Sequence, residues 1–220
     1  MPEIDTATLR ATDARLVERY STRLAKFGDD PRTLGWDKRE SQQARFGVAI
    51  DSFDFNGRSV LDVGCGLADF RDFLVDKGVR PASYTGCDIN ADLLGRCRVL
   101  QPDCAFYQAN LLVDDVPGGP FDVVTLFGVV NFRFADFSNE DFARGMIRRA
   151  FDRCREAVVI DMLSSLNDSS YPKEDFVYYH DPVEMLRFAL SITPHVTLRH
   201  DYRSIPQREM MLVLRRQPCA

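Results

Sequence analysis

The chain has 220 residues, of which 45% are hydrophobic and 28% are charged, and its formal net charge is −5. This length favours a single domain, and the apolar share is sufficient for a core without disulfide or metal staples. The acidic balance argues against a protein that binds nucleic acid phosphates. No apolar run approaches the roughly 18 residues that span a bilayer, and the N-terminal sequence lacks the apolar region of a signal peptide. We therefore expect a soluble cytoplasmic protein with no membrane or nucleic acid partner.

Cysteine and histidine spacing gives no metal-binding pattern. The six cysteines are scattered without a C-x-x-C pair, and the three histidines form neither H-x-x-x-H nor H-E-x-x-H. Structural zinc sites use such paired spacings, so we expect buried free thiols and no metal site.

Two helices are predicted in the first 58 residues. Residues 5–27 carry apolar side chains at mixed three- and four-residue steps, and Gly28, Pro31 and Gly35 then break the pattern. A second helix is expected from about Glu40 to Phe53. We expect residues 1–58 to form a helical cap that belongs to the same domain as residues 59–220.

From Ser59 onward, short apolar runs alternate with longer amphipathic segments, which is typical of a mostly parallel sheet covered on both faces. Only residues 201–209 separate the last two runs, too few for a parallel crossover, so these two are predicted to form an antiparallel hairpin. The predicted fold is a Rossmann-like, three-layer α/β domain with a seven-stranded, mostly parallel sheet. The predicted strands are Ser59–Val63, Ser83–Cys87, Ala105–Gln108, Phe121–Phe127, Ala157–Met162, Val196–His200 and Met210–Leu214. The predicted helices between them are Ala68–Lys77, Ala91–Leu100, Asn139–Arg153 and Asp181–Leu190.

A glycine turn follows the first predicted strand. Gly64 and Gly66 stand between this strand and the next helix, where the lack of a Cβ lets the backbone turn tightly and approach a ligand. The second strand ends in Asp88, about twenty residues further on, where a carboxylate binds the ribose of a nucleoside in such sheets. Ligands of open α/β sheets bind beyond the carboxyl ends of the strands, so both features are expected in one crevice.

The acids around this turn favour a positively charged ligand over a dinucleotide. Asp62 lies two residues before Gly64, and Asp69 lies at the start of the next helix. A pyrophosphate on the helix N-terminus would be repelled by these carboxylates, whereas a cation or an ammonium group would be attracted. S-adenosylmethionine carries both a sulfonium and an α-amino group.

At these motifs the sequence resembles the class I S-adenosylmethionine-dependent methyltransferases. The resemblance covers residues 59–216 and is carried by Val60–Gly66 (motif I), Tyr84–Ile89 (the acidic second motif) and Phe121–Phe127 (the fourth-strand motif). It implies that S-adenosylmethionine is the cofactor. It also implies that Gly64 and Gly66 pass under the methionine part, and that Asp62 holds the amino group directly or through water.

Further along the cofactor, the resemblance implies that Asp88 binds the ribose hydroxyls and that Ile89 packs against the adenine. Phe127, at the end of the fourth-strand motif, is expected among the cofactor contacts. Family members often place an acid at the end of the third strand to receive the adenine amino group. Here Asn110 stands in that place, and its side-chain oxygen can still accept this hydrogen bond while Leu111 supplies apolar contact.

Three residues of the predicted cap are candidates for further cofactor contacts. Arg45 is a candidate for the methionine carboxylate, because a guanidinium suits bidentate carboxylate recognition, although a surface arginine would give the same pattern. Trp36 is either a core residue or part of the cover over the cofactor, with the core favoured. Tyr20 lies on the first helix, from which it can close the pocket.

Candidate catalytic residues lie in two later loops. Asn131 follows the fourth strand, where it can hydrogen-bond a nucleophile or simply cap a turn. Tyr178 and Tyr179 lie in the insertion 168–182, where aromatic rings can stabilise a sulfonium through cation–π contact or anchor the loop to the core. His180 is a candidate general base, or a plain helix-entry residue.

The leading functional prediction is a methyltransferase that acts on a small-molecule acceptor in natural-product biosynthesis. Methyl transfer is an in-line attack, so the protein mainly aligns the reactants and needs no metal.

A second candidate is a cyclase in which the cofactor's own amino group displaces the sulfonium, giving azetidine-2-carboxylate and methylthioadenosine. Asn131, Tyr178 and Tyr179 suit this reaction. A third candidate is a non-catalytic cofactor-binding module. The acceptor and the oligomeric state stay open.

Overall fold

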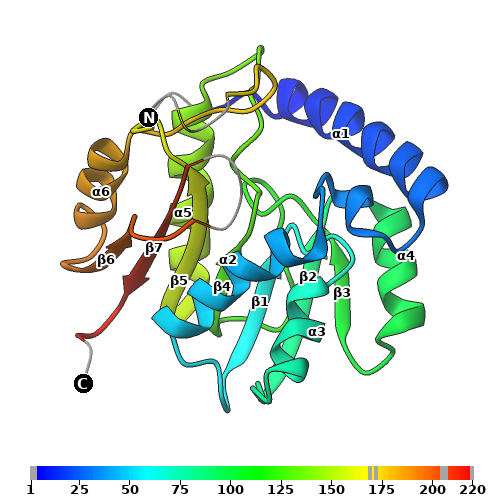
Figure 1. The fold of residues 1–220 in the computed structure, drawn as a ribbon, viewed down its shortest axis with the longest axis horizontal. Coiled ribbons are helices and arrows are strands. Elements are labelled where there is room, and N and C mark those ends of the chain that lie inside the picture. Colours follow the sequence, from blue (N-terminus) through cyan, green and yellow to red (C-terminus); the bar gives the residue numbers. More distant parts are fainter. Residues whose placement is uncertain (1–3, 168–169, 171–172, 204–207, 219–220) are drawn as a thin grey trace.

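Seven strands form one sheet in a computed structural model that describes residues 4–167, 170, 173–203 and 208–218. The strand order is β3-β2-β1-β4-β5-β7-β6, with β1 to β5 parallel and β7 antiparallel to both β5 and β6 (Figure 1). The predicted mostly parallel sheet with a closing antiparallel hairpin is confirmed. The strands are β1 (Ser59–Val63), β2 (Ser83–Asp88), β3 (Ala105–Gln108), β4 (Phe121–Leu126), β5 (Cys154–Leu163), β6 (His195–Arg199) and β7 (Glu209–Arg215).

The α-helices begin and end within a residue of their predicted bounds, whereas the short 3₁₀ helix between the first two is not among the predicted helices. Side-chain caps explain several of the helix starts. Asn90 and Asp181 each accept from two backbone amides of the following turn, and Ser138 and Asp5 each accept from one. The helices are α1 (Thr6–Phe27), the short 3₁₀ helix η1 (Pro31–Leu34), α2 (Arg39–Ser52), α3 (Asp69–Asp76), α4 (Ala91–Leu100), α5 (Asn139–Arg153) and α6 (Pro182–Leu190).

Strand β5 is longer than its apolar run indicates. It begins at Cys154 rather than at Ala157, because Arg155 and Glu156 are polar residues that occupy strand positions. The pairing between β4 and β5 shifts register between Phe121 and Val123, so this polar start lies on an irregular part of the ladder. A hydrophobic run alone does not show where such a strand begins.

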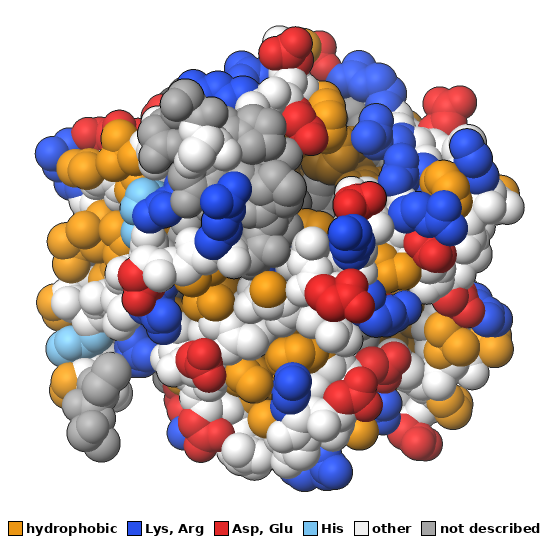
Figure 2. All heavy atoms as spheres, viewed as in Figure 1, with side chains coloured by type: hydrophobic (Ala, Val, Ile, Leu, Met, Phe, Trp, Pro, Cys, Tyr) orange, Lys and Arg blue, Asp and Glu red, His pale blue; other side chains and the backbone are white. Residues whose placement is uncertain are grey.

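Two apolar clusters pack on opposite faces of the sheet and give the three layers. One contains the buried side chains of α5 and α6, such as Met146 and Met185. The other contains those of α2 and α3, such as Phe46 and Phe70. Acidic and basic side chains are interspersed over the face seen in Figure 2, which therefore presents mixed charge rather than a basic stripe.

Helix α1 lies beside η1 and α4 at the end of the sheet where the parallel strands terminate (Figure 1). Helix α1 and η1 thus lie over this end of the strands, whereas α2 packs with α3 on one face of the sheet. The separation of residues 1–58 as a cap stays a prediction. None of the described helices is long and apolar enough to cross a membrane.

Candidate active site

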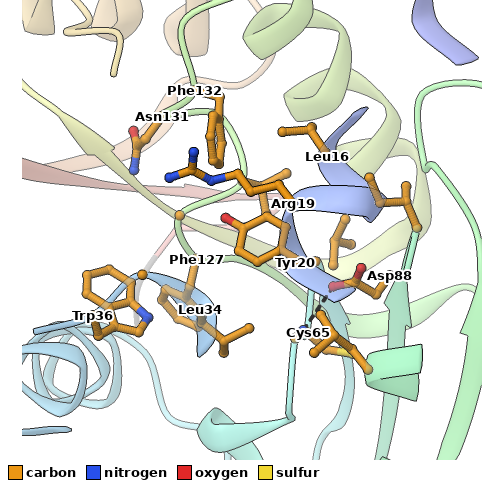
Figure 3. A pocket seen from close by; sticks show the side chains of 18 of the residues that line it. Leu16, Arg19, Tyr20, Leu34, Trp36, Cys65, Asp88, Phe127, Asn131 and Phe132 are labelled. Carbon is orange, nitrogen blue, oxygen red and sulfur yellow. Dashed lines mark hydrogen bonds between the residues drawn. The ribbon is translucent and has the colours of Figure 1, made fainter. Parts of the chain in front are cut away.

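A cavity of about 610 Å³ lies beyond the carboxyl ends of β1, β2 and β4. Its walls come from the glycine turn, from α1, η1 and α2, and from the loops after β4 and β5. This volume lies within the range of roughly 300–1,000 Å³ that is usual for small-molecule sites. Figure 3 shows side chains from α1 and from the loop after β4 pointing into the cavity from different sides.

The glycine turn brings the backbone to the cavity surface. Gly64 and Gly66 have φ angles of +66° and +57°, and the Gly66 amide donates to the Asp88 carboxylate over 3.0 Å. A Cβ on Gly66 would lie 2.7 Å from the Leu34 side chain, and one on Gly64 would lie 2.7 Å from Val129. At both positions the backbone packs closely against side chains of the cavity wall, in a conformation that favours glycine.

Asp62 lies beneath this turn as a buried acid. Its carboxylate accepts from the Tyr84 hydroxyl at 2.5 Å and from the Thr125 hydroxyl at 2.7 Å. Burial raises the pKa of Asp62 to about 6, against the effect of these two hydrogen bonds. A cationic group in the adjoining cavity would favour the ionised carboxylate.

Asp88 presents a carboxylate that is already oriented by the backbone. One oxygen accepts from the Asn90 amide at 2.9 Å and the other from the Gly66 amide at 3.0 Å. Each oxygen keeps acceptor capacity for a ligand hydroxyl. Burial raises the pKa of Asp88. Ile89 and Leu111 line the cavity as well, so the predicted ribose and adenine contacts lie on one surface.

Asn110 is already engaged by the protein. Its side-chain nitrogen donates to Asp13 of α1 at 2.9 Å, and its oxygen accepts from the Leu112 amide at 3.1 Å. Asp13 also lines the cavity, and burial raises the pKa of its carboxyl group. Sequence reasoning missed Asp13, because an acid on the polar face of an amphipathic helix carries no signal until the helix is placed.

Arg45 is buried, not on the surface. It forms ion pairs with Asp161 and Glu209, both buried, and its guanidinium lies 3.8 Å from the centre of the Trp36 ring. Burial raises the pKa of Glu209 to about 8. Because two protein carboxylates already hold Arg45, a methionine carboxylate would have to compete with them, and the predicted pairing stays a prediction.

The aromatic candidates of the cap reach the cavity. Trp36 is half-buried and lines it, so it is neither a pure core residue nor remote from the site. The Tyr20 ring packs edge-on against Phe132, with centroids 6.1 Å apart, and burial near Asp88 raises its pKa to about 12. Phe127 lines the cavity and packs on Phe70, 4.8 Å between centroids.

Asn131 lines the cavity with a side-chain amide that is largely used by the protein. Its oxygen accepts from the Leu163 amide at 2.9 Å, and its nitrogen donates to Asp161 at 3.3 Å. These bonds hold the loop after β4 against β5. The turn-stabilising interpretation is therefore the one that its contacts support.

The structure does not bring Tyr178, Tyr179 or His180 to the cavity, and it gives no support to their predicted catalytic roles. The Tyr178 hydroxyl lies 3.4 Å from Glu140, and the Tyr179 hydroxyl accepts from the Glu174 amide at 2.9 Å. His180 is buried with Nε2 3.0 Å from the Val130 carbonyl, and burial lowers its pKa. These side chains anchor residues 178–180 to the domain, and residues 168, 169, 171 and 172 of the predicted insertion lie outside the described residues. The neighbouring side chains of Glu174, Phe176 and Val177 line the cavity instead.

Comparison with known proteins agrees with this geometry. Residues 60–151 match a family of methyltransferase domains. These residues form a methyltransferase domain, and the fold is that of the class I S-adenosylmethionine-dependent methyltransferases. A fatty-acid O-methyltransferase of Mycolicibacterium smegmatis is 33% identical over 100 residues, which cover 38% of this chain and only 36% of that protein.

Solved methyltransferase structures share the fold at low identity. A Burkholderia thailandensis 1,6-didemethyltoxoflavin-N1-methyltransferase with bound S-adenosylhomocysteine has a TM-score of 0.64 at 14% identity, covering 98% of this chain and 92% of that one. A small RNA methyltransferase has a TM-score of 0.61 at 14% identity, covering 81% of this chain and 26% of that one. Such likeness shows the fold of the methyltransferase domain and leaves its acceptor open.

S-adenosylmethionine is the cofactor of this domain, and the described residues fit it. The glycine turn presents its backbone to the cavity, and the Asp88 oxygens keep acceptor capacity for hydroxyl groups. Asp62 and Asp69 add carboxylates for a cationic ligand at the same end of the cavity.

Proposed function

We propose that this protein transfers a methyl group from S-adenosylmethionine to a small-molecule acceptor in natural-product biosynthesis. The observation that carries the proposal is that the cavity continues beyond the cofactor-binding turn. We call Asp62, Gly64, Gly66 and Asp88 the acidic turn. The aromatic arm is the set of phenylalanines that line the cavity past β4, namely Phe132, Phe134, Phe137, Phe142 and Phe176. The acidic turn suits the cofactor and the aromatic arm leaves space for an apolar acceptor.

Each part of the cofactor has a matching group on the chain. S-adenosylmethionine supplies an electrophilic methyl group on its sulfonium. Asp62 holds the amino group and Asp88 the ribose hydroxyls. Asp13, which is oriented by Asn110, accepts from the adenine amino group. Because these groups belong to three different elements, they fix the cofactor at both ends, as alignment for in-line transfer requires.

The cover formed by α1 also supports a small acceptor. Leu16, Arg19 and Tyr20 of α1 point into the cavity, where they exclude water and restrict its width (Figure 3). The relatives' names agree with this proposal, since two of them act on a fatty acid and on a toxoflavin precursor. The net charge of −5 disfavours the RNA substrate of the third, because a phosphate backbone is held by basic side chains.

Product analysis with the purified protein tests the proposal. The protein is incubated with S-adenosylmethionine, alone and with small-molecule acceptors, and the nucleoside products are separated by mass spectrometry. We expect S-adenosylhomocysteine only when an acceptor is present. Methylthioadenosine formed without any acceptor would show cyclisation instead. The structure favours transfer, because Tyr178 and Tyr179 lie outside the cavity lining and so cannot hold a folded methionine chain.

Separate measurements of cofactor binding and product formation distinguish the enzyme from a non-catalytic module. Asp88→Ala is expected to abolish both product formation and cofactor binding. Wild-type protein that binds S-adenosylhomocysteine by calorimetry, yet gives no product with any acceptor, would support a binding module.

A further inference from the structure

Three arginines line the cavity, and they differ in how they are held. Arg45 is paired with two buried carboxylates, and Arg23 donates to the backbone carbonyls of Thr33 and Arg32. Arg19 has a different environment: its guanidinium carbon lies 5.7 Å from the ring centroids of both Phe132 and Phe176. Arg19 is a solvent-exposed cation on the wall of the cavity, and none of the described residues forms an ion pair with it.

The wall next to Arg19 is mainly aromatic, with Glu174 as an acidic residue near Phe176. Phe134, Phe137 and Phe142 pack on one another with centroids 4.7–5.8 Å apart, and all three line the cavity. Leu9 and Leu16 of α1 complete this wall. A ligand that fits here has an apolar body with an anionic group at one end, because burial of the body is favourable and the charge then has a partner.

We propose that the acceptor is a carboxylic acid with an apolar body in the aromatic arm, that Arg19 binds its carboxylate, and that this carboxylate receives the methyl group. The inference rests on the proposed methyl transfer and names its substrate class. One carboxylate oxygen is held by the guanidinium while the other attacks the methyl carbon. The bond between this carbon and sulfur breaks, and its electron pair goes to sulfur. The products are a methyl ester and a neutral thioether, and no proton moves.

A carboxylic acid acceptor needs no base in the cavity. A carboxylic acid with an ordinary pKa near 4 is already ionised at neutral pH, so its methylation needs no proton acceptor. The described lining contains no histidine, and His180, the predicted base, is bonded to the Val130 carbonyl away from the cavity. The described lining offers an alcohol acceptor carboxylates but no histidine as a base, and an ammonium acceptor would be repelled by Arg19.

The position of Arg19 assigns it to the acceptor rather than to the methionine carboxylate. Its two aromatic contacts, Phe132 and Phe176, belong to the aromatic arm and follow β4 and β5. The methionine part is expected at the acidic turn, after β1. Figure 3 shows the Arg19 side chain reaching toward Phe132, with Asp88 on the other side of Tyr20.

Methyl-ester formation from defined probes tests the inference. The protein is incubated with S-adenosylmethionine and octanoate, dodecanoate or hydrocinnamate, and in parallel with octan-1-ol or octylamine as uncharged and cationic counterparts. Mass spectrometry is expected to show the methyl ester of at least one acid and no methylated alcohol or amine. Arg19→Gln is expected to raise KM for the acid about tenfold or more, because a charge-assisted pair is lost. It should leave the affinity for S-adenosylhomocysteine within about twofold of wild type.

Two further variants separate charge from structure. Arg19→Lys keeps the charge and is expected to restore part of the affinity for the acid. Lys26→Gln removes a charge from the same helix outside the cavity lining and is expected to leave KM unchanged.

Three results would overturn the inference. They are methylation of the amine or alcohol in preference to the acids, methylation of none of the three acids, and loss of S-adenosylhomocysteine binding in Arg19→Gln. The proposed function fails separately, when the wild-type protein does not bind S-adenosylhomocysteine at all.

Discussion

The two ends of the cavity are built in different ways. The acidic turn is formed by β1, β2 and the short segments that follow them, and backbone amides orient its Asp88 carboxylate directly. The aromatic arm is assembled from the loop after β4, from α5 and from residues near 176, with α1 opposite. A site on adjacent parallel strands is fixed by the sheet itself. A site made of loops and helix faces depends on how separate segments pack.

Replacement of Asp88 is expected to have the largest effect on the cofactor end. Asp88→Ala should weaken binding of S-adenosylhomocysteine by more than about 100-fold, since two hydrogen bonds to a carboxylate are worth about 1.5–3 kcal/mol each. Isothermal calorimetry measures the affinity, and Asp76→Ala, which replaces an exposed acid, is the control. Wild-type affinity in Asp88→Ala would remove the acidic turn from the cofactor site.

Arg45 lines the cavity and is paired with two buried carboxylates, and its replacement tests whether its role is structural or in cofactor binding. Arg45→Ala should lower the free energy of unfolding by about 3–5 kcal/mol, because Asp161 and Glu209 would stay buried without their cation. Denaturant unfolding measures the change. Arg96→Ala, which breaks an exposed pair with Asp29, should cost no more than about 1 kcal/mol. Unchanged stability with lost cofactor affinity would assign Arg45 to the methionine carboxylate, as the sequence indicates.

Two glycines with similar backbone angles test the role of the turn. Gly66→Ala and Gly78→Ala both place a side chain at positive φ, +57° and +75°. Only at Gly66 does the new Cβ meet a residue of the cavity wall, Leu34. We expect cofactor affinity to fall about tenfold to thirtyfold in Gly66→Ala and by less than about twofold in Gly78→Ala. Equal losses in both variants would show that backbone strain, and not the cavity, is responsible.

The pH dependence of cofactor binding reports on Asp62. Its pKa is raised to about 6, so Asp62 takes up a proton as the pH falls through 6, whereas the cofactor's amino group needs the ionised carboxylate. Binding therefore releases a proton at low pH. Affinity should be constant above pH 6 and fall by up to about tenfold per pH unit below it. Calorimetry across this range, with Asp62→Asn as the variant that should lose the dependence, checks the assignment.

Asp13 is expected to have the smallest effect. Asp13→Asn should weaken S-adenosylhomocysteine binding about twofold to tenfold, the value of one hydrogen bond. The deaminated analogue S-inosylhomocysteine lacks the adenine amino group, so its affinity should not change. Equal losses for both ligands would mean that Asp13 acts through the packing of α1.

These contrasts also explain what the sequence can predict. The glycine turn, Asp62 and Asp88 are recognisable because strand, turn and acid follow one another along the chain. The alternation of short apolar runs with amphipathic segments predicts the parallel strands, but not their order in the sheet. Arg45, Asp13 and Arg19 are ordinary helix residues whose partners lie far away in the sequence. Arg45 is 116 residues from Asp161, and Asp13 is 97 residues from Asn110. The roles predicted for Tyr178 and His180 are not supported, because the composition of a loop does not show which of its side chains face the cavity.

Helix α1 covers both ends of the cavity, although it contributes little to the core. Of its 22 residues only Leu9 and Thr12 are buried. It is joined to the rest of the chain through surface polar contacts such as Arg10 to Asp114, Arg15 to Asp136 and Ser21 to Asp92. Salt screens exposed ion pairs, but it does not screen the apolar contacts on the two faces of the sheet. The cover of the cavity is therefore the part of the fold whose local opening responds most to ionic strength, and ligand exchange should quicken in high salt while global stability changes little.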